Sequence, residues 1–216
     1  MEDSTGPEMS GQSVWRALRP QVIAMGPLKV IRRIADRCPE ELVEKFDEQM
    51  LLVDDRSKAA GGFEQLVRPG RRLPKAFEAT ADSLALGLLD AWAEVGDDLG
   101  AEVSGLVVEA LGKRVAHLEF DSGVPGSGQS LSAWRLGAQV FLVGESGAYG
   151  ICGSLAGVIT AWCEFEVDIS CPGLGPKAIK AMCLDLEHPV RINGDLWMAS
   201  GDGQDKRLRK VTERLT

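Results

Sequence analysis

Residues 97–120, DDLGAEVSGLVVEALGKRVAHLEF, contain a change of hydrophobic period that decides the fold class. Up to Leu111 the apolar residues recur three or four positions apart, which is the spacing of one face of an α-helix. From Val115 to Phe120 the side chains alternate between two sets, as in a β-strand. Gly112 separates the two patterns, so the stretch predicts a helix that runs directly into a strand.

The chain upstream of this change is predicted to be helical over residues 13–112, in about five helices. Ser13 is placed to cap the first helix, and Pro27 and Pro39 are placed to open later ones. The strongest predicted helix covers 74–95, with an apolar stripe through Leu84, Leu88 and Trp92 that is typical of a central, buried helix. The Gly- and Pro-rich run 61–74 interrupts the pattern before it.

The chain downstream is predicted to be mainly antiparallel β over residues 113–203. The candidate strands are 115–120, 138–143, 158–169, 178–187 and 190–199, followed by a short basic helix over 204–216. Residues 1–12 are predicted to be a flexible tail. Helices followed by strands indicate an α+β fold, a helical part packed on a sheet and sharing one core with it, rather than alternating βαβ units.

Composition excludes several classes of protein. The 216 residues are 44% hydrophobic and 26% charged, which is ordinary for a globular chain and not for a disordered or coiled-coil one. The net charge of −8 argues against nucleic acid or an anionic membrane as the main partner. Its polar start and short apolar stretches predict neither a secretory signal nor a membrane span. Five cysteines without tight spacing favour free thiols in the cytoplasm.

Charge is distributed unevenly along the chain. Residues 14–75 carry 13 basic and 9 acidic groups, whereas residues 76–121 carry 2 basic and 10 acidic groups. Residues 204–216 are basic again, with 5 basic and 2 acidic groups. Two basic sets are the candidate binding residues, and each is a possible docking surface or simply a solvated charge run. They are Arg68, Arg71, Arg72 and Lys75 in a loop, and Lys206, Arg207, Arg209 and Lys210 near the end.

One segment resembles the nucleophile region of trypsin-like serine proteases. It comprises Gly144-Glu145-Ser146-Gly147, then Cys152, then residues 155–162, and covers about 20 of the 216 residues. The resemblance implies Ser146 as the nucleophile and the amides of Gly144 and Ser146 as an oxyanion hole. Glu145, Ala148 and Tyr149 depart from the family pattern, and the helical N-terminal part leaves no place for the family's histidine. A glycine-containing turn between two strands is the prediction for this segment.

The order Ser146, Asp168, His188 is also similar to that of α/β-hydrolases, whose nucleophile stands on a strand-to-helix elbow. The chain between Ser146 and His188 is short for the βα units of that fold. His117, Glu119 and Asp121 alternate along one strand face and offer three types of metal ligand, but a solvated strand face is the commoner explanation of such a set. The prediction is therefore no catalytic residue, no metal and no cofactor.

Taken together, these patterns favour a non-enzymatic, cytoplasmic protein-interaction module, such as an adaptor, inhibitor or structural subunit, that docks a protein partner through charged surfaces. Two alternatives stay open: a small-molecule sensor with a pocket between helices and sheet, and a serine hydrolase that uses Ser146. Self-association of the chain stays open as well.

Overall fold

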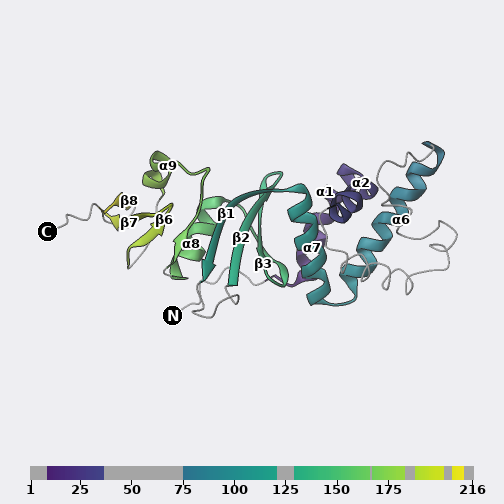
Figure 1. The fold of residues 1–216 in the computed structure, drawn as a ribbon, viewed down its shortest axis with the longest axis horizontal. Coiled ribbons are helices and arrows are strands. Elements are labelled where there is room, and N and C mark those ends of the chain that lie inside the picture. The colour runs from purple at the N-terminus through teal and green to yellow at the C-terminus, as the bar shows by residue number, and fades with distance from the viewer. Residues whose placement is uncertain are drawn as a thin grey trace. The chain divides into compact units, whose positions relative to one another are not determined.

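A computed structural model of the chain shows an α+β fold, with helices in the N-terminal half followed by two β-sheets and short helices (Figure 1). The structure describes residues 9–36, 75–120, 129–165, 167–182, 188–201 and 206–211. The predicted helix at 39–53 and the interrupted run 61–74 lie outside these residues. The contacts divide the chain into two units: a helical unit with residues 9–112 and 146–150, and a β unit with the rest.

The helical unit contains four described helices. They are α1 (Gly11–Met25), α2 (Pro27–Ala35), α6 (Lys75–Glu94) and α7 (Asp97–Leu111). The prediction that Pro27 opens a helix is confirmed. Helix α1 begins earlier than predicted, inside the stretch assigned to the tail, because Ser10 rather than Ser13 is its N-cap. The Ser10 hydroxyl accepts a hydrogen bond from the Ser13 amide at 3.3 Å.

Helix α6 is central in this unit, as its apolar stripe predicts, because it contacts α1, α2 and α7. Leu88 and Trp92 are buried, whereas Leu84 is only half-buried. The other side chains of α6 that are described as buried are small or aliphatic: Ala81, Ala85, Leu89 and Ala93. Small residues let neighbouring helix backbones approach α6 closely.

Glycines set the closest contacts of this unit. A Cβ on Gly11 of α1 would overlap the backbone of Asp97 and Ala101 in α7. A Cβ on Gly147 would likewise overlap the backbone of Ala101, and Gly147 has a φ of +111°, which side-chain-bearing residues rarely adopt. Helix α1 and the start of strand β4 therefore approach the α7 backbone closely at positions that only glycine fills.

The first sheet has the strand order β1-β2-β3-β4. Its strands are β1 (Lys113–Phe120), β2 (Gln129–Leu136), β3 (Gln139–Gly144) and β4 (Gly147–Cys152). The predictions of β1 and β3 are confirmed, and β2 is a strand that the sequence patterns did not indicate. β1 pairs antiparallel with β2, and β2 with β3, in a register that places Leu118 opposite Leu131 and Ala133 opposite Leu142.

The second sheet has the strand order β5-β6-β7-β8. Its strands are β5 (Asp168–Ile169), β6 (Val190–Ile192), β7 (Asp195–Ser200) and β8 (Arg207–Lys210). Only the β5–β6 pair is parallel. A bridge links the two sheets of the β unit, since the amides and carbonyls of His117 and Ser170 exchange hydrogen bonds of 2.8 Å. One side of the second sheet is buried through Val190, Ile192, Trp197 and Leu208.

Two predicted strands are wrong. The stretch 158–169 forms α8 (Leu155–Trp162) and a short 3-10 helix, η1 (Cys163–Phe165), before β5. Ser154 caps α8 by accepting a hydrogen bond from the Gly157 amide, and the helix buries Val158, Ile159 and Trp162 on one face. The stretch predicted as strand 178–187 begins with α9 (Pro176–Ala181), which Pro176 opens.

The predicted strand 190–199 is a hairpin. Asn193 and Gly194 have φ values of 54° and 78° and form the turn between β6 and β7. An Asn-Gly pair adopts these left-handed values easily, which is why it is a strong hairpin signal. The predicted strand therefore contains a turn that its own sequence encodes.

The predicted C-terminal helix over 204–216 is also wrong in its described part, because residues 207–210 form β8. Leu208 alone among these four residues is buried, and it lies opposite Ala199 of β7. Pairing with β7 and burial of Leu208 therefore override the helical spacing of Leu208, Val211 and Leu215, a tertiary effect that local patterns do not contain.

Candidate partner-binding face

Of the two predicted basic sets, the structure describes all four residues of the C-terminal set and only Lys75 of the loop set. Arg68, Arg71 and Arg72 lie outside the described residues, and Lys75 is described only as the first residue of α6. Lys206, Arg207, Arg209 and Lys210 fall on or beside strand β8. The second set is therefore the one whose geometry is defined.

Strand alternation divides this set between the two sides of the sheet. Lys210 is in register with Trp197, whose side chain is buried, and its ammonium pairs with Asp195 at 2.6 Å. Arg207 and Arg209 point to the other side and are exposed. Lys206, just before the strand, is half-buried. The ion pair neutralises Lys210, whereas the exposed Arg207 and Arg209 lie on the opposite side of the sheet.

A third arginine joins them from strand β6. Arg191 is exposed between the buried residues Val190 and Ile192, so its side chain lies on the side opposite the buried one. It is in register with Leu196 of β7, and Arg209 is in register with Met198. The side chains of Leu196 and Met198 therefore form a strip along β7, with an arginine on either flank.

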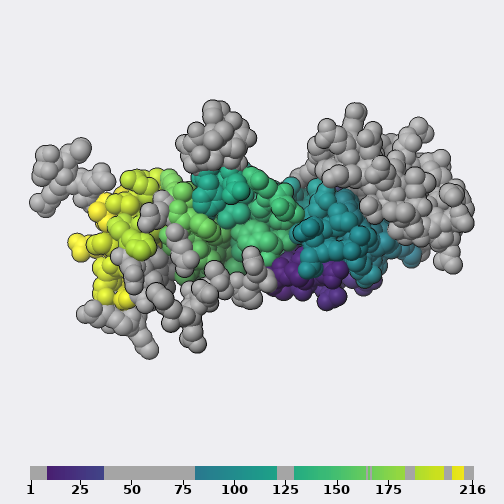
Figure 2. Space-filling model, turned by 90° about the horizontal axis from the view of Figure 1, so that it is seen from below, coloured from purple at the N-terminus to yellow at the C-terminus, as the bar shows by residue number. Residues whose placement is uncertain are grey.

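We call this surface the arginine face and define it as Arg191, Leu196, Met198, Arg207 and Arg209. Met198 is 46% exposed and is one of four large apolar side chains that are exposed in the described residues. Neither Arg191 nor Arg209 has an ion-pair partner within the described ranges. In Figure 2 the C-terminal strands, coloured yellow, form part of the visible surface.

One carboxylate borders this face. Asp168 of β5 is in register with Arg191, and its Oδ1 accepts a hydrogen bond from the Gly194 amide at 3.1 Å. This bond ties Asp168 to the β6–β7 turn. With three arginines and one aspartate, the described charge of the area is positive although the whole chain carries −8. The area therefore suits an acidic partner with an apolar group.

Sequence reasoning missed Arg191 and Met198. The signal for Arg191 is its place between Val190 and Ile192, since alternation assigns it to the side opposite two aliphatic residues. Met198 carries no such signal, because an apolar residue in a strand is usually counted as core. Its exposure follows from its alternation with Trp197, which is fully buried.

Ser146 lies in an exposed two-residue turn between β3 and β4, as predicted. The elbow of α/β-hydrolases requires a helix directly after the serine. Here strand β4 comes next, and α8 begins only at Leu155. The local backbone at Ser146 is therefore that of a β-hairpin.

The predicted set on strand β1 forms a pair rather than a triad in the described residues. His117 Nε2 lies 3.0 Å from Glu119 Oε1, on a largely exposed carboxylate, and Asp121 is outside the described ranges. No group of three His, Cys, Asp or Glu side chains that could hold a metal ion occurs among the residues that were described.

The three described cysteines, Cys152, Cys163 and Cys171, are free thiols. Burial raises the pKa of the Cys152 and Cys171 thiols above the usual value, because desolvation disfavours the thiolate. Cys171 also donates a hydrogen bond to the Val115 carbonyl at 3.3 Å. Thiols in such surroundings are poor nucleophiles.

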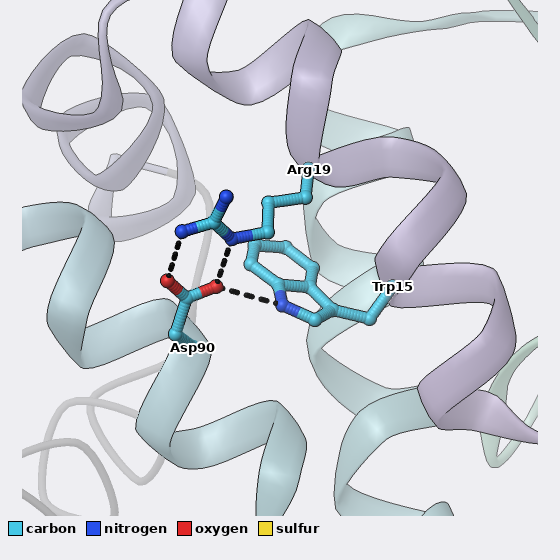
Figure 3. Close-up of polar contacts among 3 residues, drawn as sticks. All are labelled: Trp15, Arg19 and Asp90. Atoms are coloured by element: carbon cyan, nitrogen blue, oxygen red, sulfur yellow. Dashed lines mark hydrogen bonds and ion pairs between the residues drawn. The ribbon is translucent and has the colours of Figure 1, made fainter.

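A polar cluster joins α1 to α6 in the helical unit (Figure 3). Arg19 donates two hydrogen bonds of 2.8 Å to Asp90, one to each carboxylate oxygen, and Trp15 Nε1 donates a third of 3.0 Å to Asp90 Oδ1. The bond to Asp90 raises the pKa of Arg19 further. Trp15 and Trp197 are buried and Trp134 is half-buried, so Trp15 and Trp197 belong to the core rather than to an exposed interface.

Comparison with known proteins gives no relative: the chain matches no protein-family model, no curated protein and no solved structure at a significant level. Among the described helices, none has the length and apolar character that crossing a membrane requires. Any function of this chain is therefore inferred from its own surface.

Proposed function

We propose that this chain is a non-enzymatic protein-interaction module that docks an acidic protein partner on the arginine face, and that it works in the cytoplasm. The observation that carries the proposal is the arrangement of Arg191, Arg207 and Arg209 around Met198. An exposed apolar side chain bordered by arginines matches the usual composition of interfaces, which are enriched in Met and Arg.

The chemistry of the face favours a protein over a nucleic acid. Single-stranded nucleic acids need aromatic side chains on which bases stack, and none belongs to the arginine face. Guanidinium groups bind carboxylates through two parallel hydrogen bonds, which fix the orientation of the partner. The predicted loop set of Arg68, Arg71 and Arg72 is a second proposed contact for the same partner.

The test is the rate of association with the partner, which is first recovered by co-purification with the full chain from native cells. In the test variant, Arg191→Gln, Arg207→Gln and Arg209→Gln are combined. In the control, Lys113→Gln, Arg114→Gln and Lys177→Gln are combined, which removes the same charge from exposed residues elsewhere. Long-range attraction acts mainly on the association rate.

The proposal predicts that the test variant associates several-fold more slowly and loses most of its salt dependence. The control variant should associate like the parent chain. Equal rates for the two variants would show that only net charge matters, and the arginine face would then not be the docking site.

A further inference from the structure

On the unburied side of the second sheet, an apolar patch lies between two arginines. Leu196 and Met198 of β7 share this side. Pairing continues one residue beyond β8, since the Val211 amide donates a hydrogen bond of 2.8 Å to the Leu196 carbonyl. Val211 therefore lies opposite Leu196, on the same side of the sheet. Arg191 of β6 and Arg209 of β8 stand on the two flanks of this patch.

The strand register fixes the spacing of the two arginines. Arg191 and Arg209 lie on the two neighbours of β7 (Figure 1), which puts them about 10 Å apart across the sheet. Their partners on β7, Leu196 and Met198, are two residues apart, so the arginines are also offset by about 7 Å along the strands. The two Cα atoms are therefore about 12 Å apart, on a diagonal that crosses β7 within the apolar patch.

Both guanidinium groups are available to a partner. Arg191 and Arg209 are exposed, and neither forms an ion pair within the described ranges. Asp168, which is in register with Arg191, accepts its hydrogen bond from the Gly194 amide instead. Two guanidinium groups at this spacing, with apolar side chains between them, are complementary to two carboxylates on either side of an apolar group.

We propose that the arginine face binds an amphipathic α-helix of an acidic protein, through two acidic residues seven positions apart and an apolar residue between them. The inference rests on the proposed docking role of this face and names what the partner presents to it. Residues i, i+4 and i+7 of a helix share one face. Seven residues span about 10.5 Å, and the flexible arginine side chains cover the remaining difference. The carboxylates at i and i+7 then reach Arg191 and Arg209, while the apolar residue at i+4 covers Met198.

The position of the arginines on a sheet face favours a helix over an extended peptide. An extended peptide with acidic residues four positions apart spans a similar distance, about 13 Å. Across this face, however, its backbone N–H and C=O groups would meet only side chains and would stay unpaired, whereas a helix pairs these groups internally. Addition of a strand needs a free sheet edge. At the edge strand β8, the Leu208 amide already donates to the Met182 carbonyl at 3.3 Å.

The first experiment measures the binding of two synthetic peptides to the full chain by fluorescence anisotropy at low salt. Each peptide is about 18 residues long, which is enough for helix formation, and consists of alanine and glutamine apart from two glutamates and one leucine. The matched peptide has glutamates at i and i+7 and leucine at i+4. The shifted peptide has the same composition but has its glutamates at i and i+5, which point to different sides of the helix. Circular dichroism checks that the two peptides are equally helical.

We expect the matched peptide to bind about tenfold more tightly than the shifted one, because the shifted peptide can place only one carboxylate on an arginine at a time. Equal affinities for the two peptides would overturn the proposal. Absence of binding of the matched peptide would overturn it as well.

The second experiment assigns each carboxylate to one arginine by double-mutant cycles. Arg191→Gln and Arg209→Gln are each measured against matched peptides in which one glutamate is replaced by glutamine. Each arginine should couple to one glutamate and not to the other, so that removal of both members of a pair weakens binding little more than removal of one. Lys177→Gln, at an exposed site elsewhere, is the control for net charge and should bind like the parent. Additive losses in every combination would contradict the proposed contact.

Met198→Gln tests the apolar part of the contact and guards against loss of folding. It changes an exposed side chain and no charge, so circular dichroism and the unfolding temperature should match those of the parent. This variant should bind the matched peptide several-fold more weakly, and an unchanged affinity would contradict the proposed contact.

The peptide series and the test of the proposed function fail separately. If the peptides do not discriminate but the triple arginine variant still associates slowly with the co-purified partner, the helix is wrong and the docking role stands. If that variant associates like the parent chain, the docking role is wrong and the helix proposal falls with it.

Discussion

Met198 of β7 lies directly opposite Arg209 of β8, on the side of the second sheet that is not buried. Its neighbour in sequence, Trp197, points the other way and is fully buried. One strand thus contributes a core anchor and a surface contact in consecutive residues. The strand pairing and the core beneath it fix the backbone positions of the exposed side chain and of the arginines beside it.

The glycine contacts of the helical unit give the first prediction. Gly11→Ala should lower the free energy of unfolding by about 1–3 kcal/mol, because the new methyl group would overlap the α7 backbone. Gly87→Ala on α6 is the matched control, since nothing lies within 4 Å of its Cβ position. It should raise the stability by up to about 1 kcal/mol. Urea unfolding of both variants measures the contrast, and equal effects would contradict the close α1–α7 contact.

The cluster of Trp15, Arg19 and Asp90 gives the second prediction. Asp90→Ala should cost about 1–3 kcal/mol, because the buried Trp15 N–H loses its acceptor and Arg19 loses two hydrogen bonds. Arg16→Ala, an exposed arginine of the same helix, should change stability by less than about 0.5 kcal/mol. Thermal unfolding of the two variants provides the measurement. A similar loss in both would mean that the cluster does not bind α1 to α6.

The hairpin at Ser146 gives the third prediction. A fluorophosphonate probe, which labels activated serines, should not modify Ser146, because its turn leads into a strand rather than a helix. Ser146→Ala should bind the partner as the parent chain does. Intact-mass spectrometry after labelling is the measurement, with a known serine hydrolase as the positive control. Stoichiometric labelling that disappears in Ser146→Ala would establish the hydrolase alternative instead.

The buried thiols give a prediction about pH. Because the pKa of Cys171 is raised in the folded state, less thiolate is present there than in the unfolded chain at the same pH. Its contribution to stability is complete below the ordinary thiol pKa and is lost as the pH rises through the raised value.

Iodoacetamide should therefore modify Cys171 much more slowly in the native protein than in the urea-unfolded one at neutral pH, and Cys152 should show a smaller protection. Peptide mass spectrometry resolves the individual sites. Equal rates in native and unfolded protein would contradict the burial of Cys171.

Local sequence patterns were sufficient to predict those helices and strands whose signals lie within their own residues. Three elements could be predicted in this way. They are helix α6 from its apolar stripe, the start of α2 from its proline, and strand β1 from its alternation. The same patterns failed where residues far away in the sequence decide which element forms. Strand β8 exists because β7 supplies its pairing partner, and its basic residues separate onto two sides only once that pairing is known.

The candidate site shows the same division. Arg207 and Arg209 were identifiable as a basic pair in the sequence, whereas Arg191 joins them only through the pairing of β6 and β8 with β7. The α8 segment shows the opposite error. The alternation at the end of 158–169 favoured a strand, but the cap at Ser154 and the shared buried face of Val158 and Trp162 make its first part a helix.

The most direct measurement of the central claim is the association rate with the co-purified partner at low and high salt, for the parent, the triple arginine variant and the matched lysine and arginine control. Together, Arg191→Gln, Arg207→Gln and Arg209→Gln should slow association several-fold and flatten its salt dependence, while dissociation changes less. The control should keep the parent's rate and salt dependence. A triple arginine variant that associates as fast as the parent at low salt would show that the arginine face is not the docking site.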